Sequence, residues 1–180
     1  QRVLKTAYTL YKQGYNITVA GRLLHNSGEL NVPFKSKRFK LHFNKGFLFY
    51  ATYNIRLFIF LLFSKVDIIL SNDTDTLPAC YLASKIRNKE LVFDAHELFP
   101  EMADLQNRHF VKKFWAYIED IIFPHLKHCY TVSASIVDYY KKKYGINMQL
   151  VRNVPYLKQK IQQKTKLLNY GDKKIILYQG

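Results

Sequence analysis

The sequence predicts an α/β fold built on a Rossmann-like, doubly wound parallel sheet. Short runs of β-branched and other apolar residues alternate with stretches whose apolar residues recur every three or four positions. Polar residues directly follow several of these runs, as they do at the carboxyl ends of parallel strands. The 180 residues are 48% apolar, which suffices for the packed core of one ordinary domain.

The N-terminal stretch predicts a helix followed by two strands. Residues 3–12 have helical spacing, and Gly14 is placed to end this helix in a left-handed conformation. Alternating patterns predict strands over 15–21 and 37–43, with a loop over 23–32 between them. An α/β sheet usually opens with a strand, so we expect the first strand and its loop to be missing upstream of the helix.

Residues 46–63 form the most apolar stretch of the chain. Its length invites interpretation as a transmembrane helix, but Asn54 and Arg56 lie near its centre, where an arginine costs roughly 2.5–3.5 kcal/mol on insertion scales. We therefore expect a buried or interfacial helix. Core packing is the favoured explanation, and contact with a bilayer surface is the alternative, because lysine and arginine residues flank the stretch.

The remainder of the chain predicts further strands joined by helices. The strands are expected at 66–70, 91–94, 129–133, 148–151 and 173–180, and the helices run through 80–86, 110–123 and 136–140. Thr74 or Asp75 is expected to cap the first of these helices and Ser133 or Ser135 the third, which Gly145 ends. The Lys/Gln-rich residues 157–172 are interpreted as a linker.

Charge is distributed unevenly along the chain, whose formal net charge is +15. Counted from the sequence, residues 1–65 carry +10, residues 66–140 carry −4 and residues 141–180 carry +9. Two basic flanks around a more acidic centre favour a basic surface that faces phosphates or anionic lipid, with a solubilising charge bias as the alternative. Cys80 and Cys129, both in apolar contexts, favour buried thiols in a reducing, cytoplasmic compartment.

Ionisable residues follow two of the predicted strands. Asp94, His96 and Glu97 come directly after the strand at 91–94, and Asp73 and Asp75 follow the strand at 66–70. Ligands bind beyond the carboxyl ends of strands in open α/β sheets, so these side chains are candidates for one shared site. In the alternative interpretation, the carboxylates only cap the next elements and His96 is an ordinary satisfied histidine.

Several well-known motifs do not occur. The chain has no G-x-x-x-x-G-K-[ST] loop, no G-x-G-x-x-G and no second histidine after His96-Glu97 at zincin spacing. Its two cysteines form no C-x-x-C, and no serine lies in a nucleophile elbow. We therefore expect no metal site and no cofactor. RNP-type and helix-turn-helix patterns are also missing, which counts against a nucleic-acid partner.

The order of several segments resembles the N-terminal half of a GT-B glycosyltransferase of family 4, of the bacterial polysaccharide biosynthesis type. The segments are RVLKTA with the following GYNITV, DIILSND, FDAHELFPE, TVS before a helix, RNVP, and IILYQG near the end of the chain. The resemblance spans almost the whole chain. It implies a Rossmann-like acceptor-side domain over 1–156, a linker over 157–172, and in 173–180 the first strand of a truncated donor-binding domain.

The resemblance also implies an activity and roles for residues. A nucleotide-sugar would donate its glycosyl group, with retention of configuration, to a glycan or lipid-linked acceptor held by this half. His96 would face the cleft as the catalytic histidine, hydrogen-bonded to the donor sugar or the acceptor, with Glu97 beside it. Asp94, Asp73 and Asp75 would contact the acceptor.

Arg152 and Asn153 would lie near the cleft, where the chain crosses to the second domain. The resemblance is incomplete, because the donor-binding half and the glycine-rich first loop are lacking, and we expect these residues alone to be inactive. The enzyme would be cytoplasmic, either free or peripheral at the inner membrane face, with no nucleic acid among its partners. The alternatives are a non-catalytic basic α/β module that binds anionic membrane or nucleic acid, and a different α/β enzyme such as a sugar epimerase or hydrolase.

Overall fold

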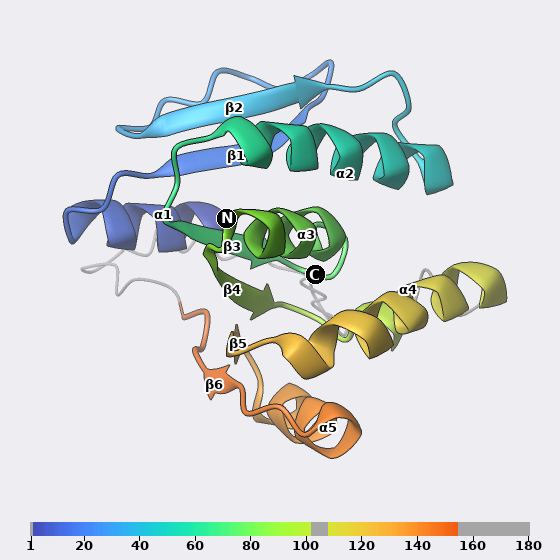
Figure 1. The fold of residues 1–180 in the computed structure, drawn as a ribbon. Helices are drawn as coiled ribbons and strands as arrows, with labels where there is room; N and C mark the ends of the chain where they lie inside the picture. The colour runs from blue at the N-terminus through green and yellow to red at the C-terminus, as the bar shows by residue number, and fades with distance from the viewer. Residues whose placement is uncertain (1, 102–107, 155–180) are drawn as a thin grey trace, which may run out of the picture.

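The computed structural model describes residues 2–101 and 108–154, which form two parallel sheets flanked by helices (Figure 1). The first sheet pairs β1 (Thr18–Leu23) with β2 (Lys35–Lys40). The second has the order β3–β4–β5–β6, formed by Ile68–Asn72, Glu90–Ala95, His128–Thr131 and Gln149–Leu150. The α/β class and the parallel pairing that the sequence predicts are confirmed.

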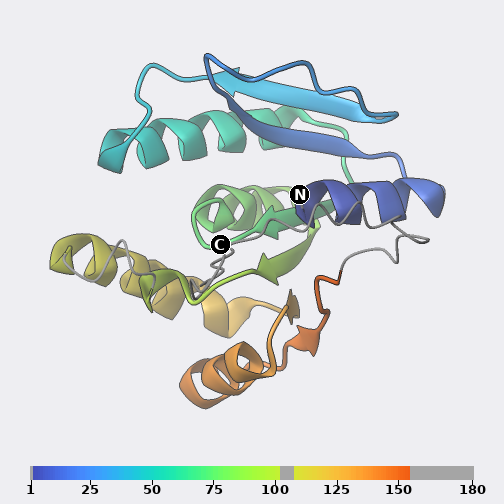
Figure 2. The same ribbon diagram turned by 180° about the vertical axis from the view of Figure 1, so that it is seen from behind.

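Helices cover both faces of the strands. They are α1 (Arg2–Lys12), α2 (Gly46–Phe63), α3 (Leu77–Arg87), α4 (His109–Ile122) and α5 (Ala134–Tyr144), with the short 3-10 turns η1 (Phe99–Glu101) and η3 (Phe123–His125). In Figure 1, α2, α3 and α4 lie in front of the strands. In Figure 2, which shows the molecule from behind, α1 lies in front of β3 instead. The chain is therefore wound on both sides, as a doubly wound fold requires.

Two apolar clusters hold the helices against the strands. One joins β4 and β5 to α4 and α5 and contains the fully buried Phe93, Phe123 and Tyr140. The other joins α2 and α3 to β2 and β3. Cys129 belongs to the first and Cys80 to the second, and both are buried free thiols, as expected from their apolar contexts. Each fully buried large apolar side chain stabilises the fold by roughly 1.5–3 kcal/mol.

The apolar helix α2 spans the predicted residues 46–63. One side of it is buried through Tyr53, Leu57 and Leu61, which recur every four positions and pack against the second cluster. Much of its other side is exposed, including Leu48, Ile55 and Ile59. Within the described ranges it is the one helix long and apolar enough to cross a membrane, judged by length and composition. Core packing therefore explains only one side of this helix.

Tertiary pairing shifts some of the predicted boundaries. The strand expected at 66–70 lies at 68–72, because β3 pairs in parallel register with β4, from Ile68 opposite Glu90 to Asn72 opposite Asp94. Ser71 and Asn72 were expected to follow the strand and instead belong to it. The first strand is likewise later than expected, at 18–23, and the second is earlier, at 35–40.

The predicted N-cap of α3 is wrong, and that of α5 is right in position only. Thr76, and neither Thr74 nor Asp75, is the N-cap residue of α3, and it makes no capping hydrogen bond with its side chain. The hydroxyl of Thr74 instead donates to buried Glu119. Ser133 is the N-cap residue of α5, but its hydroxyl is hydrogen-bonded to that of Ser135 and not to the helix backbone. These side chains had better partners elsewhere in the fold than the free amides of the helix ends.

The sheet that the sequence predicts as continuous is split between β1 and β3. A pocket of about 190 Å³ separates them, and β1, β3, α1 and α2 supply most of its lining. Within residues 2–101 and 108–154, no strand pairs with both β1 and β3. The predicted linker over 157–172 and strand over 173–180 lie outside the described residues.

Candidate functional site

The carboxyl ends of β3 and β4 form a shared rim. The two strands are neighbours in the second sheet and run parallel, with Asn72 opposite Asp94. Asp73, the first residue after β3, therefore lies beside the end of β4, which contains Asp94 and is followed by His96. The backbone amide of Asp73 donates to the carbonyl oxygen of Asp94 at 2.9 Å. The expected meeting of these two strand ends is confirmed.

Asp94 is the buried centre of this rim. Its carboxylate is fully buried and accepts two hydrogen bonds from the guanidinium of Arg2, Nη2 to Oδ1 at 2.7 Å and Nε to Oδ2 at 3.1 Å. The guanidinium also lies over the ring of Tyr130, 5.4 Å from its centroid. A two-point arginine contact of this kind fixes both the position and the plane of the carboxylate.

His96 lies between two carboxylates. Its Nε2 is 3.0 Å from Oδ2 of Asp94, and its Nδ1 is 3.3 Å from Oδ2 of Asp73. Its backbone amide donates to Oδ1 of Asp73 at 2.8 Å. The imidazole is about one-quarter exposed, at 23%, so it lies at the rim and not in the apolar interior. We call Arg2, Asp73, Asp94 and His96 the rim cluster.

The backbone of Asp73 is left-handed, with a φ of 61°. This conformation is uncommon for residues other than glycine, and aspartate tolerates it better than most. Here it turns the chain from β3 toward α3 and directs the carboxylate of Asp73 back to His96. The turn continues through Thr74, which is fixed from the other side by its hydrogen bond to Glu119.

The electrostatics of the rim cluster favour a protonated His96. The hydrogen bond to Asp94 raises the pKa of His96 above its ordinary value, the charge of Asp73 adds to this, and partial burial opposes it. Burial raises the pKa of Asp73, as do the charges of Asp94 and Glu97, whereas the contacts with His96 lower it. An imidazolium between carboxylates donates from both ring nitrogens, so it suits hydrogen bonding and charge stabilisation better than proton abstraction.

The remaining acidic candidates lie at the edge of the rim cluster. Asp75 shares the turn with Asp73, and burial, followed by the charge of Asp73, raises its pKa to about 6. Its carbonyl oxygen accepts a hydrogen bond from Asn54 of α2 at 2.8 Å. Glu97 is exposed and has no hydrogen bond or ion pair within the described part of the chain, although it is close enough to affect the pKa of Asp73.

The structure places Arg152 and Asn153 along α1. The ammonium group of Lys5 donates to Oδ1 of Asn153 at 3.0 Å and to the carbonyl oxygen of Val154 at 3.1 Å. Lys5 lies almost one helical turn after Arg2 in α1. Residues 153 and 154 therefore contact the same helix that carries the arginine of the rim cluster. Neither Arg152 nor Asn153 contacts His96 in the described structure.

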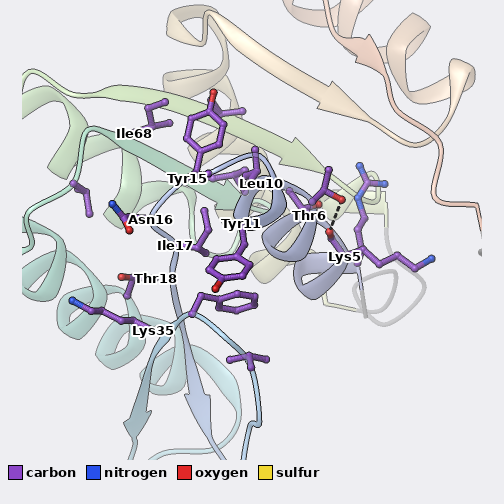
Figure 3. Close-up of a pocket in the computed structure, with 18 of the residues that line it drawn as sticks. Lys5, Thr6, Leu10, Tyr11, Tyr15, Asn16, Ile17, Thr18, Lys35 and Ile68 are labelled. Carbon is purple, nitrogen blue, oxygen red and sulfur yellow. Dashed lines mark hydrogen bonds between the residues drawn. The ribbon is translucent and has the colours of Figure 1, made fainter.

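A pocket of about 1280 Å³ extends along α1 and includes Arg2 of the rim cluster, but not Asp73, Asp94 or His96. Arg2, Lys5, Arg152 and Asn153 line it, together with residues of β1, β3 and the start of β2. Figure 3 shows Lys5, Thr6, Leu10 and Tyr11 of α1 beside Tyr15 to Thr18, with Ile68 of β3 at one side. The basic groups of this lining suit an anionic ligand better than a cationic one. Across residues 2–101 and 108–154, no group of three or more His, Cys, Asp or Glu residues is arranged to hold a metal ion.

Sequence reasoning missed Arg2, Tyr130 and Glu119. Arg2 is 92 residues from Asp94, and no spacing or motif relates the two. Glu119 lies four residues after Trp115, on the same side of an amphipathic helix, and it is fully buried. A charged residue on the apolar side of a helix was the one available signal, and it points to a buried partner without identifying it.

Comparison with known proteins adds one finding. A family model described as Glycosyltransferase Family 4 matches residues 1–155. No curated protein matches the chain. The matched range includes the whole rim cluster as well as Arg152 and Asn153.

Proposed function

This chain belongs to Glycosyltransferase Family 4, and from that premise we propose that it is the acceptor-side half of a retaining glycosyltransferase with two Rossmann-like domains. A nucleotide-sugar donates its glycosyl group to a glycan or lipid-linked acceptor. The observation that carries the proposal is the rim cluster, which joins α1, β3 and β4 at the edge where α/β sheets bind their ligands.

Exposure divides the rim cluster into two parts. His96 and Asp73, with side chains 23% and 28% exposed, face outward. A sugar hydroxyl near the reacting carbon enters between them and replaces their 3.3 Å contact, while Nε2 of His96 stays on Asp94. Asp94 is fully buried and Arg2 is nearly so, at 0% and 10%, so they orient the imidazole and do not touch the sugar. We therefore assign Asp94 an orienting role in place of the acceptor contact expected from the resemblance. Asp75 and Glu97 flank the acceptor.

The second half of the reaction site is proposed to be a separate donor-binding domain. Arg152 and Asn153 then lie where the chain passes between the two halves. The 180 residues alone transfer no sugar, because none of the candidate residues forms a donor diphosphate site beside His96. No metal ion or cofactor takes part on this side, and the nucleotide-sugar is a substrate. The enzyme works in the cytoplasm, peripheral to the inner face of the membrane.

The experiment is a transfer assay on the full-length gene product with a panel of nucleotide-sugars. His96→Ala is expected to lower kcat by about 100-fold, the typical loss when one hydrogen-bond donor to a reacting centre is removed. His42→Ala is the matched control, because His42 is an exposed histidine outside the rim cluster. Unchanged turnover in His96→Ala would remove His96 from the site, and transfer by residues 1–180 alone would contradict the need for a second half.

A further inference from the structure

Helices α2, α3 and α4 together carry an apolar surface that no other described residue covers. They lie on the same side of the strands (Figure 1), and α3 packs against both α2 and α4. The rings of Phe47 in α2 and Phe114 in α4 are also in contact, with centroids 6.0 Å apart. The outward sides of the three helices therefore form one connected surface, which we call the helical face.

The exposed residues of α2 and α4 follow the same spacing. In α2 they are Leu48, Ile55, Ile59 and Phe63, and in α4 they are Phe110, Phe114, Tyr117 and Ile121. Successive members are separated by three, four or seven positions, so within each helix they share one side. Phe63 and Phe110 are 84% and 90% exposed, which is unusual for side chains of this size. Leu82 and Ile86 extend the helical face across α3.

Each helix carries one exposed cation: Arg56 of α2, Lys85 of α3 and Lys113 of α4. The guanidinium of Arg56 also donates a hydrogen bond to the carbonyl oxygen of Lys40 at 2.6 Å. Neither α2 nor α3 contains an acidic residue. On α4, Glu119 is buried, and the charge of the exposed Asp120 is balanced by Lys143 of α5, whose ammonium group lies 3.8 Å from Oδ1. The helical face therefore combines large apolar side chains with uncompensated positive charge.

We propose that the helical face binds the surface of an anionic lipid bilayer. The apolar residues enter the boundary between headgroups and acyl chains while Arg56, Lys85 and Lys113 contact lipid phosphates, as in amphipathic helices that lie in the membrane plane. Helix α2 lies on the bilayer and does not span it, because its other side is committed to the protein core through Tyr53, Leu57 and Leu61. This inference rests on the proposed peripheral location and identifies the surface responsible for it.

The test measures binding of the chain to phosphatidylcholine vesicles with and without phosphatidylglycerol, by co-sedimentation. Binding is expected with phosphatidylglycerol and is expected to weaken when salt is raised. Ile59→Glu should lower the partition coefficient by about tenfold, because it removes an inserted side chain and adds a repelled charge. The double variant Lys85→Glu/Lys113→Glu should lower it by a similar factor through charge alone.

The matched controls lie on the other side of the molecule. Tyr15→Glu changes an exposed aromatic residue after α1, and Lys12→Glu reverses an exposed lysine at the end of α1, so neither should alter binding. Far-UV circular dichroism checks that each variant is folded, and Phe63→Ser replaces Ile59→Glu if that variant unfolds.

Two results would overturn the proposal. One is vesicle binding that the helical-face variants do not change. The other is a chain that binds no vesicles but forms a concentration-dependent dimer, which Ile59→Glu abolishes. In that case the helical face would be a contact between two copies of the chain. Vesicle binding is measured without any sugar donor, so its failure is distinguishable from failure of sugar transfer.

Discussion

Glu119 is a carboxylate enclosed between α4, α5 and the turn after β3. Its Oε1 accepts hydrogen bonds from Thr74 at 3.3 Å and from Tyr140 at 3.1 Å. Its Oε2 lies 3.4 Å from the hydroxyl of Tyr144 and 3.9 Å from the ammonium group of Lys143. Burial nevertheless raises the pKa of Glu119 from an ordinary value of 4.5 to about 7, because these donors only partly replace water.

This raised pKa makes folding stability depend on pH. Below pH 4.5 the folded and unfolded chains both hold the proton, so the contribution of Glu119 is fully present. As pH rises through about 7, the unfolded chain is favoured, since it ionises this carboxyl more easily. A difference of roughly two and a half pH units at about 1.4 kcal/mol each gives a loss of about 3 kcal/mol.

The perturbation is Glu119→Gln, which keeps the shape and cannot ionise. We expect the free energy of unfolding of this variant, relative to the unchanged chain, to rise by about 3 kcal/mol between pH 4.5 and pH 8. Urea denaturation at a series of pH values measures it. Glu29→Gln, at an exposed carboxylate, is the control and should not change the pH dependence. Parallel stability curves for Glu119→Gln and the unchanged chain would refute the reasoning.

Three further predictions concern the rim cluster and the thiols. Arg2→Met should destabilise the fold by about 3–5 kcal/mol in urea denaturation, because it removes both guanidinium hydrogen bonds from the buried carboxylate of Asp94 and leaves it with His96 alone, and adding Asp94→Asn should recover part of the loss. In an NMR titration the pKa of His96 should lie above its ordinary value, and Asp94→Asn should lower that pKa. The contribution of His96 to folding stability is fully present below pH 6.5 and is lost as pH rises through the pKa of the folded chain. Thiol reagents should label Cys80 and Cys129 only after unfolding, because burial raises each pKa to about 12, and rapid labelling of the native chain would contradict this.

Local patterns in the sequence were sufficient for much of the fold. The bounds of α2 are as predicted, and the ends of α1 and α5 at Gly14 and Gly145 follow from the left-handed conformation that glycine allows. The meeting of Asp73 with Asp94 and His96 also follows from the sequence, since neighbouring parallel strands end at one edge. The cap of α3 did not follow, because Thr74 hydrogen-bonds Glu119, and Ser133 caps α5 in position only, because its hydroxyl is hydrogen-bonded to Ser135.

The sequence by itself determined the alternation of strands and helices and the strand ends that carry the acidic residues and the histidine, because these depend on residues close together in the chain. Only the tertiary structure decided that Arg2 neutralises Asp94, that Glu119 is buried against Thr74, and that the outer sides of α2 and α4 remain exposed. The first two are contacts between residues far apart in sequence. The third depends on which helix sides the other described elements cover. Periodicity records that a side chain is apolar or charged, but not which distant element packs against it.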